Sequence, residues 1–201
     1  MFVWTTNNIS NTYFSIINKT NSIINNCLIL NSNNGFSFNN SFNNNILNSV
    51  FYKNKNSVDI YKNNIGYFKF FNNVFIENEK CINSVDSSQI YFINNNFDKN
   101  TSVLNFKLNN KSKKSIISKN NIYSNNINNF KLKNIKISNS YCISNTDSLI
   151  GYYNIYDHPK YIDSNSFNYE LDNSSPGIRS GINNLNLGVN IKDINIIKYL
   201  K

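Results

Sequence analysis

A pattern of nine residues recurs through the middle of this 201-residue sequence and constrains its fold more than any other feature. It reads, with small variations, apolar, apolar, Asn, Asn, any residue, aromatic or aliphatic, any two residues, and a closing Asn. The closing Asn residues are separated by 23, 24, 22, 25 and 20 positions. A period of this length is typical of a solenoid, in which each repeat stacks on its neighbours. The six copies are Ile23–Asn31, Ile46–Asn54, Phe70–Asn78, Phe92–Asn100, Ile117–Asn125 and Ile137–Asn145.

Three columns of apolar residues emerge when the six copies are superimposed. The residues three and eight places before the closing Asn are apolar in every copy. A third apolar residue follows the closing Asn by four places in four copies and by five in the other two. We therefore predict that each coil supplies three inward-facing patches. The columns are Leu28, Phe51, Phe75, Phe97, Ile122 and Cys142; Ile23, Ile46, Phe70, Phe92, Ile117 and Ile137; and Phe36, Val58, Ile82, Leu104, Phe130 and Leu149.

The segments between Asn residues are short and alternate apolar with polar residues, as in Phe68-Lys69-Phe70. Some solenoids of similar period carry short helices, but segments of this length favour strands over helices of about ten or more residues. Asn tolerates left-handed backbone geometry better than any residue except Gly, so paired Asn residues at fixed offsets indicate sharp corners. These features predict an all-β fold, a parallel β-helix of about six coils of 20–25 residues within residues 1–150.

The composition fits this fold. The chain contains 49 Asn residues and no Ala, which disfavours an ordinary helical protein. In stacked coils, like side chains lie over one another about 4.8 Å apart, so Asn is expected to form amide ladders. Lys53, Glu77 and Lys99 directly precede the closing Asn in consecutive coils, which predicts a stack of opposite charges.

The net charge of +9 does not predict a nucleic-acid partner. The excess comes almost entirely from Lys residues spread along the chain, and Arg179 is the single arginine. The densest basic stretch, from Lys111 to Lys119, is interpreted as a solvated loop.

Cys27, Cys81 and Cys142 are widely spaced and accompany a single His, so we expect buried thiols and neither a metal site nor a cofactor. No apolar run approaches the roughly 18 residues of a membrane helix, and residues 1–8 lack the features of a signal peptide. Membrane insertion is therefore not expected.

One period before Asn31 lies Asn8, whose coil would have to begin before Met1. Two alternatives stay open. Either upstream coils of a longer chain complete the solenoid, or an irregular segment with Trp4, Tyr13 and Phe14 covers its first coil.

After residue 150 the repeat fades, and Asp157-His158-Pro159-Lys160-Tyr161, Tyr169-Glu170-Leu171 and Ser175-Pro176-Gly177-Ile178 follow. Together with the Asn-rich coils, this segment resembles the closing part of secreted right-handed parallel β-helix proteins of the pectin-lyase-like superfamily. The resemblance implies a right-handed solenoid, an irregular C-terminal cap over residues 151–201, and an extracellular or cell-surface location. Pro159 and Pro176 interrupt regular pairing, and we expect Tyr161, Phe167, Leu171 and Ile178 to cover the last coil.

Members of that superfamily are often polysaccharide lyases or hydrolases, but no catalytic residue is assigned here. Glu77 and Asp98 are the nearest carboxylates on neighbouring coils, and their side chains are expected on opposite faces. Lys69 and Lys107 are interpreted as solvated strand residues. The Asp157-His158-Pro159 string is interpreted as a turn.

The sequence therefore predicts a non-catalytic structural or carbohydrate-contacting module of an exported or surface protein, with a polysaccharide as its partner. Tyr52 and Tyr123 stand two places before the closing Asn and are the expected carbohydrate-contacting residues, as exposed rings among amides and hydroxyls. The alternative is the C-terminal part of a polysaccharide lyase or glycoside hydrolase whose active site lies mostly outside this chain.

Overall fold

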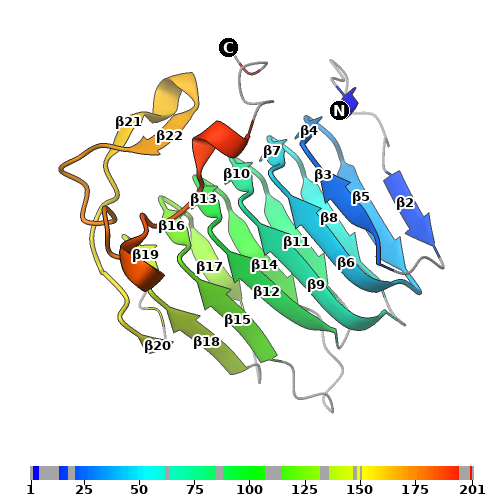
Figure 1. Ribbon diagram of the computed structural model, residues 1–201. Coiled ribbons are helices and arrows are strands. Elements are labelled where there is room, and N and C mark those ends of the chain that lie inside the picture. The colour runs from blue at the N-terminus through cyan, green and yellow to red at the C-terminus, as the bar shows by residue number, and fades with distance from the viewer. Residues whose placement is uncertain are drawn as a thin grey trace.

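The computed structural model describes residues 2–4, 14–17, 21–61, 64–84, 88–106, 115–131, 136–146, 149, 151–194 and 200. Lys107, Tyr13 and residues 111–114 of the basic stretch lie outside these residues. The chain winds through three parallel sheets, which stack its coils one above another (Figure 1). Five complete turns of three strands run from residue 23 to residue 131, so the predicted parallel β-helix is confirmed with slightly fewer turns than expected.

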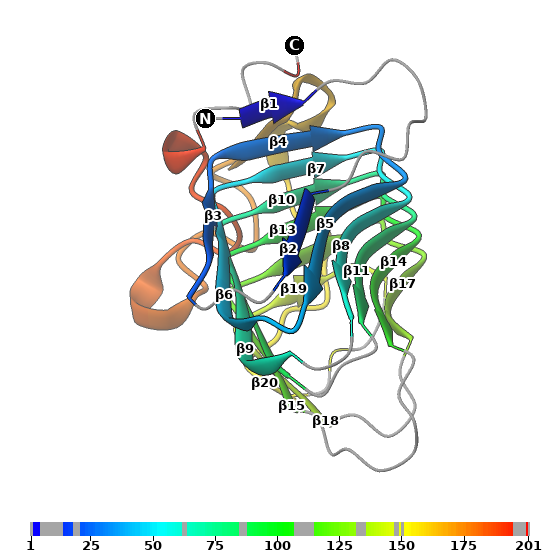
Figure 2. The same ribbon diagram turned by 90° about the vertical axis from the view of Figure 1, so that its right-hand side faces the viewer.

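Each sheet contains one strand from successive coils, and Figure 2 shows two of these stacks side by side. Sheet A contains β1 (Phe2–Trp4), β4 (Cys27–Leu30), β7 (Val50–Tyr52), β10 (Val74–Ile76), β13 (Asn96–Asp98), β16 (Ile122–Ser124) and β19 (Ile143–Ser144). Sheet B contains β2 (Phe14–Ile17), β5 (Asn34–Asn39), β8 (Asn56–Ile60), β11 (Lys80–Ser84), β14 (Ser102–Phe106) and β17 (Asn128–Lys131). Sheet C contains β3 (Ile23–Asn25), β6 (Phe42–Leu47), β9 (Ile65–Phe71), β12 (Gln89–Ile93), β15 (Ser115–Lys119), β18 (Lys136–Ser140) and β20 (Gly151–Tyr152).

Left-handed residues turn the chain between sheets, as the Asn pairs predict. At the corner from sheet C to sheet A, here the C–A corner, each coil places one residue with φ between 48° and 57°. Asn fills this position in five coils and Tyr in the last two: Asn26, Asn48, Asn72, Asn94, Asn120, Tyr141 and Tyr153. The A–B corner uses Asn31, Lys53, Glu77, Lys99 and Asn125 in the same way.

The residue after each corner turns inward and builds the predicted amide ladders. In one ladder, Asn54, Asn78, Asn100 and Asn126 stack, and each Nδ2 donates to the next Oδ1 at 3.0 Å. Each Oδ1 also accepts the backbone N–H of the Asn one coil before it. A second ladder joins Asn73, Asn95 and Asn121. The ladders are buried, so they satisfy backbone groups that the corners would otherwise leave without partners.

The predicted register is wrong by one residue in some coils. Val50 pairs with Leu28, so Ile29 is the residue that joins Phe51 in the core column. Tyr123 likewise pairs with Phe97, which moves Ile122 to the outer face of sheet A. A shift of one place reverses the face of every side chain in a strand.

The three inward columns have mixed outcomes. Phe51, Phe75, Phe97 and Tyr123 form a continuous stack, with ring centroids 4.6–5.1 Å apart. Ile23 is 69% exposed, and Ile24 takes its expected place beside Ile46. The third column is confirmed, since its first five residues pair across sheet B and Leu149 is buried in the same core. The three cysteines are free and buried, as expected.

The N-terminal strands continue the solenoid. Phe2–Trp4 pairs in parallel with β4, and Phe14–Ile17 pairs in parallel with β5. The described residues around Trp4 and Phe14 are therefore regular strands and not an irregular cover. The charge stack is present between Lys53 and Glu77, whose charged atoms are 3.6 Å apart. Among the described residues, no comparable ion pair joins Glu77 to Lys99.

The C-terminal segment runs back along the outer face of sheet A (Figure 1). Ile155 forms an isolated parallel β-bridge with Ile143 on the last coil. Residues 160–194, here called the strap, then contact several coils of the solenoid: Phe167 reaches Tyr52, Leu171 returns to Ile122 and Ile143, and Asn190 bonds Asn72. The strap includes β21 (Tyr161–Asp163), η1 (Ser164–Ser166), β22 (Asn168–Leu171), η2 (Ile182–Asn184) and η3 (Ile191–Asp193). No helix in the described residues is long and apolar enough to cross a membrane.

The expectation that these residues cover the last coil is confirmed for Tyr161, Leu171 and Ile178, which cluster with Ile122 and Ile143, and is wrong for Phe167. Phe167 packs edge-on against Tyr52 of the second complete coil, with ring centroids 5.2 Å apart. The physical reason is that the outer face of sheet A is itself apolar, at Leu28, Val50, Val74 and Ile122, and requires a cover along its length.

Candidate binding site at the end of the solenoid

Of the two predicted carbohydrate-contacting residues, Tyr123 does not reach the surface. Its ring is fully buried against Phe97, and its hydroxyl lies 2.7 Å from the Ser118 hydroxyl. The expected exposure of Tyr123 is wrong because its true register places it on the core face. Tyr52 lies on the outer face of sheet A, half-buried under Phe167, so the two tyrosines share no column. Carbohydrate contact at Tyr52 stays a prediction.

Three other tyrosines gather where the solenoid ends. Tyr152 ends β20 and is 75% exposed, while Tyr153 at the C–A corner is 73% exposed. Tyr141 occupies the same corner one coil earlier, and its ring stacks on that of Tyr153 with centroids 4.9 Å apart at 19°. The backbone N–H of Tyr141 donates to the Tyr152 carbonyl at 3.1 Å, which fixes the two coils together. We call these three residues the tyrosine platform.

The backbone of the platform is strained. Tyr141 and Tyr153 have φ of 53° and 57°, a region that bulky side chains rarely occupy. Five earlier coils place Asn there, which adopts this geometry readily. Backbone strain that a different residue type would relieve is concentrated at functional sites in proteins. The sequence contained a signal for this feature, since Tyr141-Cys142 and Tyr153-Asn154 stand where earlier coils have Asn followed by Asn, Ser or Cys.

Polar side chains continue from the platform along the outer face of sheet C. Tyr152 pairs with Ser140, and Ser140 pairs with Lys119 on the preceding strand. Asn154, next to Tyr153, accepts the backbone N–H of Cys142 at 3.0 Å. The platform is therefore an aromatic surface bordered by hydroxyl, ammonium and amide groups.

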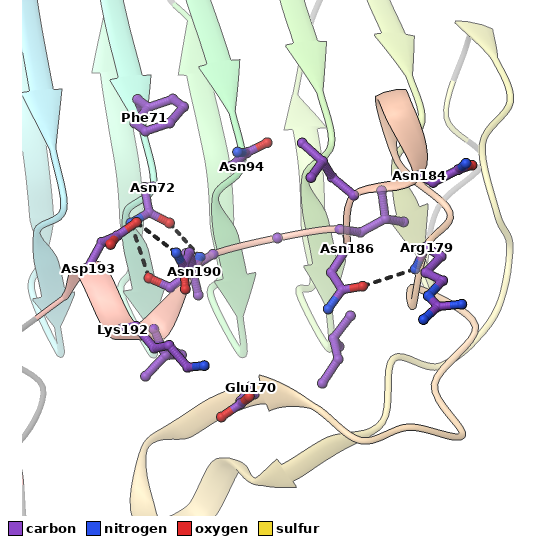
Figure 3. A pocket seen from close by; sticks show the side chains of 16 residues that line it. Phe71, Asn72, Asn94, Glu170, Arg179, Asn184, Asn186, Asn190, Lys192 and Asp193 are labelled. Atoms are coloured by element: carbon purple, nitrogen blue, oxygen red, sulfur yellow. Dashed lines mark hydrogen bonds between the residues drawn. The ribbon is translucent and has the colours of Figure 1, made fainter.

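A cleft of about 490 Å³ lies farther along the same corner, between the strap and the solenoid (Figure 3). Phe71, Asn72 and Asn94 line it from the solenoid. The strap contributes the other lining residues, which are Glu170, Leu171, Arg179, Asn184, Leu185, Asn186, Leu187, Gly188, Val189, Asn190, Ile191, Lys192 and Asp193.

Amides of the C–A corner hold the strap beside this cleft. The backbone N–H of Asn190 donates to Asn72 Oδ1 at 2.6 Å, and that of Ile182 donates to Asn120 Oδ1 at 3.1 Å. Gly188 passes so close to the solenoid that a Cβ at this position would lie 2.1 Å from Asn96 Oδ1, and its φ is 77°. Only glycine fits there.

Asp98 anchors the strap to the solenoid. Its buried carboxylate accepts hydrogen bonds from Tyr169 Oη at 3.0 Å, Ser124 Oγ at 2.7 Å and Asn125 Nδ2 at 2.8 Å. Glu77, its predicted nearest carboxylate, lies at the A–B corner and pairs with Lys53. The backbone N–H of His158 donates to Asp157 Oδ1 at 2.7 Å, and the predicted turn at Asp157-His158-Pro159 stays a prediction. Among the described residues, no three His, Cys, Asp or Glu side chains gather as metal ligands would.

Buried phenols and thiols predict an alkaline limit to stability. Burial raises the pKa of Tyr169 and Tyr161, with the Asp98 carboxylate as a further cause, and burial raises the pKa of Cys81. The folded state thus keeps protons that the unfolded chain loses near pH 8.5–10, so these groups stabilise it fully below that range and less as pH rises. We expect the free energy of unfolding in urea to fall from about pH 9 upward, and a constant value from pH 7 to 11 would contradict this.

No protein-family model and no curated protein matches this chain. The functional interpretation therefore depends on the tyrosine platform, the cleft beside the strap and the fold that positions them.

Proposed function

We propose that this chain is a non-catalytic, carbohydrate-binding β-helix module of an exported or surface protein, and that its tyrosine platform binds a glycan. The observation that carries the proposal is the stacked pair Tyr141 and Tyr153, held in left-handed geometry with the outer ring 73% exposed. The resemblance of the C-terminal segment to the pectin-lyase-like superfamily supports an exported β-helix that contacts polysaccharide.

The platform suits a sugar ring for two reasons. The faces of Tyr rings carry negative partial charge and attract the polarised C–H groups of a sugar, while the phenol hydroxyls and neighbouring polar groups bond its hydroxyls. Because Tyr153 is supported from behind by Tyr141, little side-chain freedom remains to be lost on binding. The left-handed corner that strains the backbone of the two tyrosines also fixes the position of their rings before a glycan binds.

Replacement of Tyr141 and Tyr153 by Asn should change glycan affinity and folding stability in opposite directions. We expect the double variant Tyr141→Asn, Tyr153→Asn to lose at least about tenfold in glycan affinity, because two aromatic contacts disappear. The same variant should unfold at higher urea concentration, with stability raised by about 1 kcal/mol or more, because Asn relieves the strain. Affinity electrophoresis in gels containing soluble polysaccharides and urea denaturation measure the two effects.

A matched control is Tyr61→Asn, which removes a 46% exposed tyrosine that directly follows β8 of sheet B, away from the platform. It should leave glycan retardation unchanged. Retardation of the platform variant equal to that of the wild type would overturn the assignment of the site. Release of reducing ends or unsaturated products by the wild-type chain would instead favour the lyase or hydrolase alternative.

A further inference from the structure

The N-terminal end of the solenoid presents three strand edges. β1, β2 and β3 are the outermost strands of sheets A, B and C, and within the described residues each pairs with a strand on one side only. Figure 2 looks toward this end of the molecule. The outer edge of a terminal strand is where a further strand adds to a sheet, so this end is a place at which another set of strands can dock.

The apolar core is least covered at the same end. In the first sheet B column, Phe14 is 36% exposed, its neighbour Phe36 is 5% exposed, and Val58 one coil farther is fully buried. Ile16 is likewise only half-buried, whereas Phe38, its partner on β5, is fully buried. One more coil over this end would remove the remaining apolar surface of these columns from water.

The edge strands carry nothing that would discourage pairing. Exposed edges in natural proteins usually bear charged residues or proline, which oppose the addition of another strand. The three strands read Phe-Val-Trp, Phe-Ser-Ile-Ile and Ile-Ile-Asn, without a charged residue or a proline, in a chain that is 15% charged. Ile17 and Ile23 on these strands are 51% and 69% exposed. Because no charged side chain on these strands repels a like copy, this end is compatible with itself.

The C-terminal end of the solenoid is instead covered by the chain itself. The backbone N–H of Ile155 donates to the Cys142 carbonyl at 2.8 Å, and its carbonyl accepts the N–H of Ser144 at 3.0 Å. The Tyr156 hydroxyl donates to the carbonyl of the buried Leu149 at 2.8 Å. The two ends are therefore not complementary, and a head-to-tail stack of copies would have to displace these contacts.

We propose that two copies of this chain associate through their N-terminal ends about a twofold axis. The three edges run in three directions, so a single extended peptide could pair with only one of them, whereas a second copy offers three edges in the same triangular arrangement. A twofold axis reverses the direction of winding, so every strand meets an antiparallel one. With the axis through sheet C, β3 meets its own counterpart, and β1 and β2 meet β2 and β1 of the second copy.

This inference goes beyond the proposed function and does not depend on it. The tyrosine platform lies at the other end of the solenoid, so this association leaves the platform of each copy accessible.

Sedimentation velocity of the wild-type chain over a wide range of concentration tests the inference, and we expect a dimer. The double variant Ile17→Lys, Ile23→Lys should raise the dissociation constant at least about tenfold, because like charges then face each other across the interface. Both side chains are exposed, so the urea midpoint of the monomer should change little. The matched control is Ile65→Lys, Ile127→Lys, which charges side chains 59% and 71% exposed on other parts of the surface.

Amide hydrogen exchange above and below the dissociation constant locates the interface. We expect association to add protection in β2 and β3 and to leave β17 and β20 unchanged. Protection gained at both ends, with assemblies that grow with concentration, would show head-to-tail stacking and overturn the twofold arrangement. Equal weakening of the dimer by the two double variants would place the interface elsewhere. A monomer at every concentration would sink the inference and favour upstream coils of a longer chain as the cover.

Discussion

Replacing Asn78 by Ala lowers the free energy of unfolding by about 3–5 kcal/mol, although the side chain lost is small and polar. Asn78 Oδ1 accepts the backbone N–H and the Nδ2 of Asn54, and its own Nδ2 donates to Asn100 Oδ1 and to the Phe51 carbonyl. All four bonds are buried. Their loss leaves the Asn54 N–H without a partner and opens a gap in the middle of the ladder.

Urea denaturation followed by circular dichroism measures this effect, with Asn39→Ala as the control. Asn39 is exposed in β5, so its replacement should change stability by less than about 0.5 kcal/mol. Equal effects of the two substitutions would show that the buried ladder does not stabilise the fold. Asn78→Asp should be at least as harmful as Asn78→Ala, because a carboxylate in this position cannot donate to Phe51 or Asn100.

Ending the chain at Asp157 has a larger effect still. The strap covers the outer face of sheet A, where Leu28, Val50, Val74, Ile76 and Ile122 are buried. Each such side chain contributes about 1.5–3 kcal/mol when it leaves water, and their sum is comparable with the roughly 5–15 kcal/mol by which a domain is stable. We expect the truncated chain to aggregate or to lose its cooperative unfolding transition.

If the truncated chain is insoluble, a point substitution can test whether the strap stabilises the fold. Leu187 is buried against the last coils, so Leu187→Ala should reduce stability by about 2–4 kcal/mol. Leu185→Ala, which removes a 56% exposed side chain two residues away, serves as its control. A truncated chain that remains monomeric with an unchanged thermal midpoint would contradict a stabilising role for the strap.

The period and the Asn pairs were sufficient to predict the parallel β-helix, because corners and ladders need Asn at fixed offsets. The register was harder to predict. In the coils of Lys53, Glu77 and Lys99 a charged residue takes the left-handed corner position, and the next Asn joins the ladder. In the fifth coil Asn125 takes the corner position and Asn126 the ladder, so two identical neighbours have opposite roles. That ambiguity placed Tyr123 on the wrong face.

The tyrosine platform was not predicted for a related reason. Tyr141 and Tyr153 occupy a corner position that earlier coils fill with Asn, whereas the predicted tyrosines, Tyr52 and Tyr123, were chosen by their place two residues before the closing Asn. The path of the strap could not be read from residues 151–201 by themselves. It depends on the apolar outer face of sheet A, which the shifted register had concealed at Leu28 and Ile122.

The strap also affects how the solenoid unfolds. In an open repeat protein each coil touches only its neighbours, so the terminal coils fray while the middle stays folded. Here Ile194 and Leu200 belong to a cluster with Leu28 and Leu30 of the first complete coil, while Leu187 packs on Ile143 of the last. The C-terminal segment thus packs against coils at both ends of the solenoid. We therefore expect that neither end unfolds without weakening the packing of the other. Hydrogen exchange should accordingly show similar protection in β4 and β16 instead of a gradient toward either end.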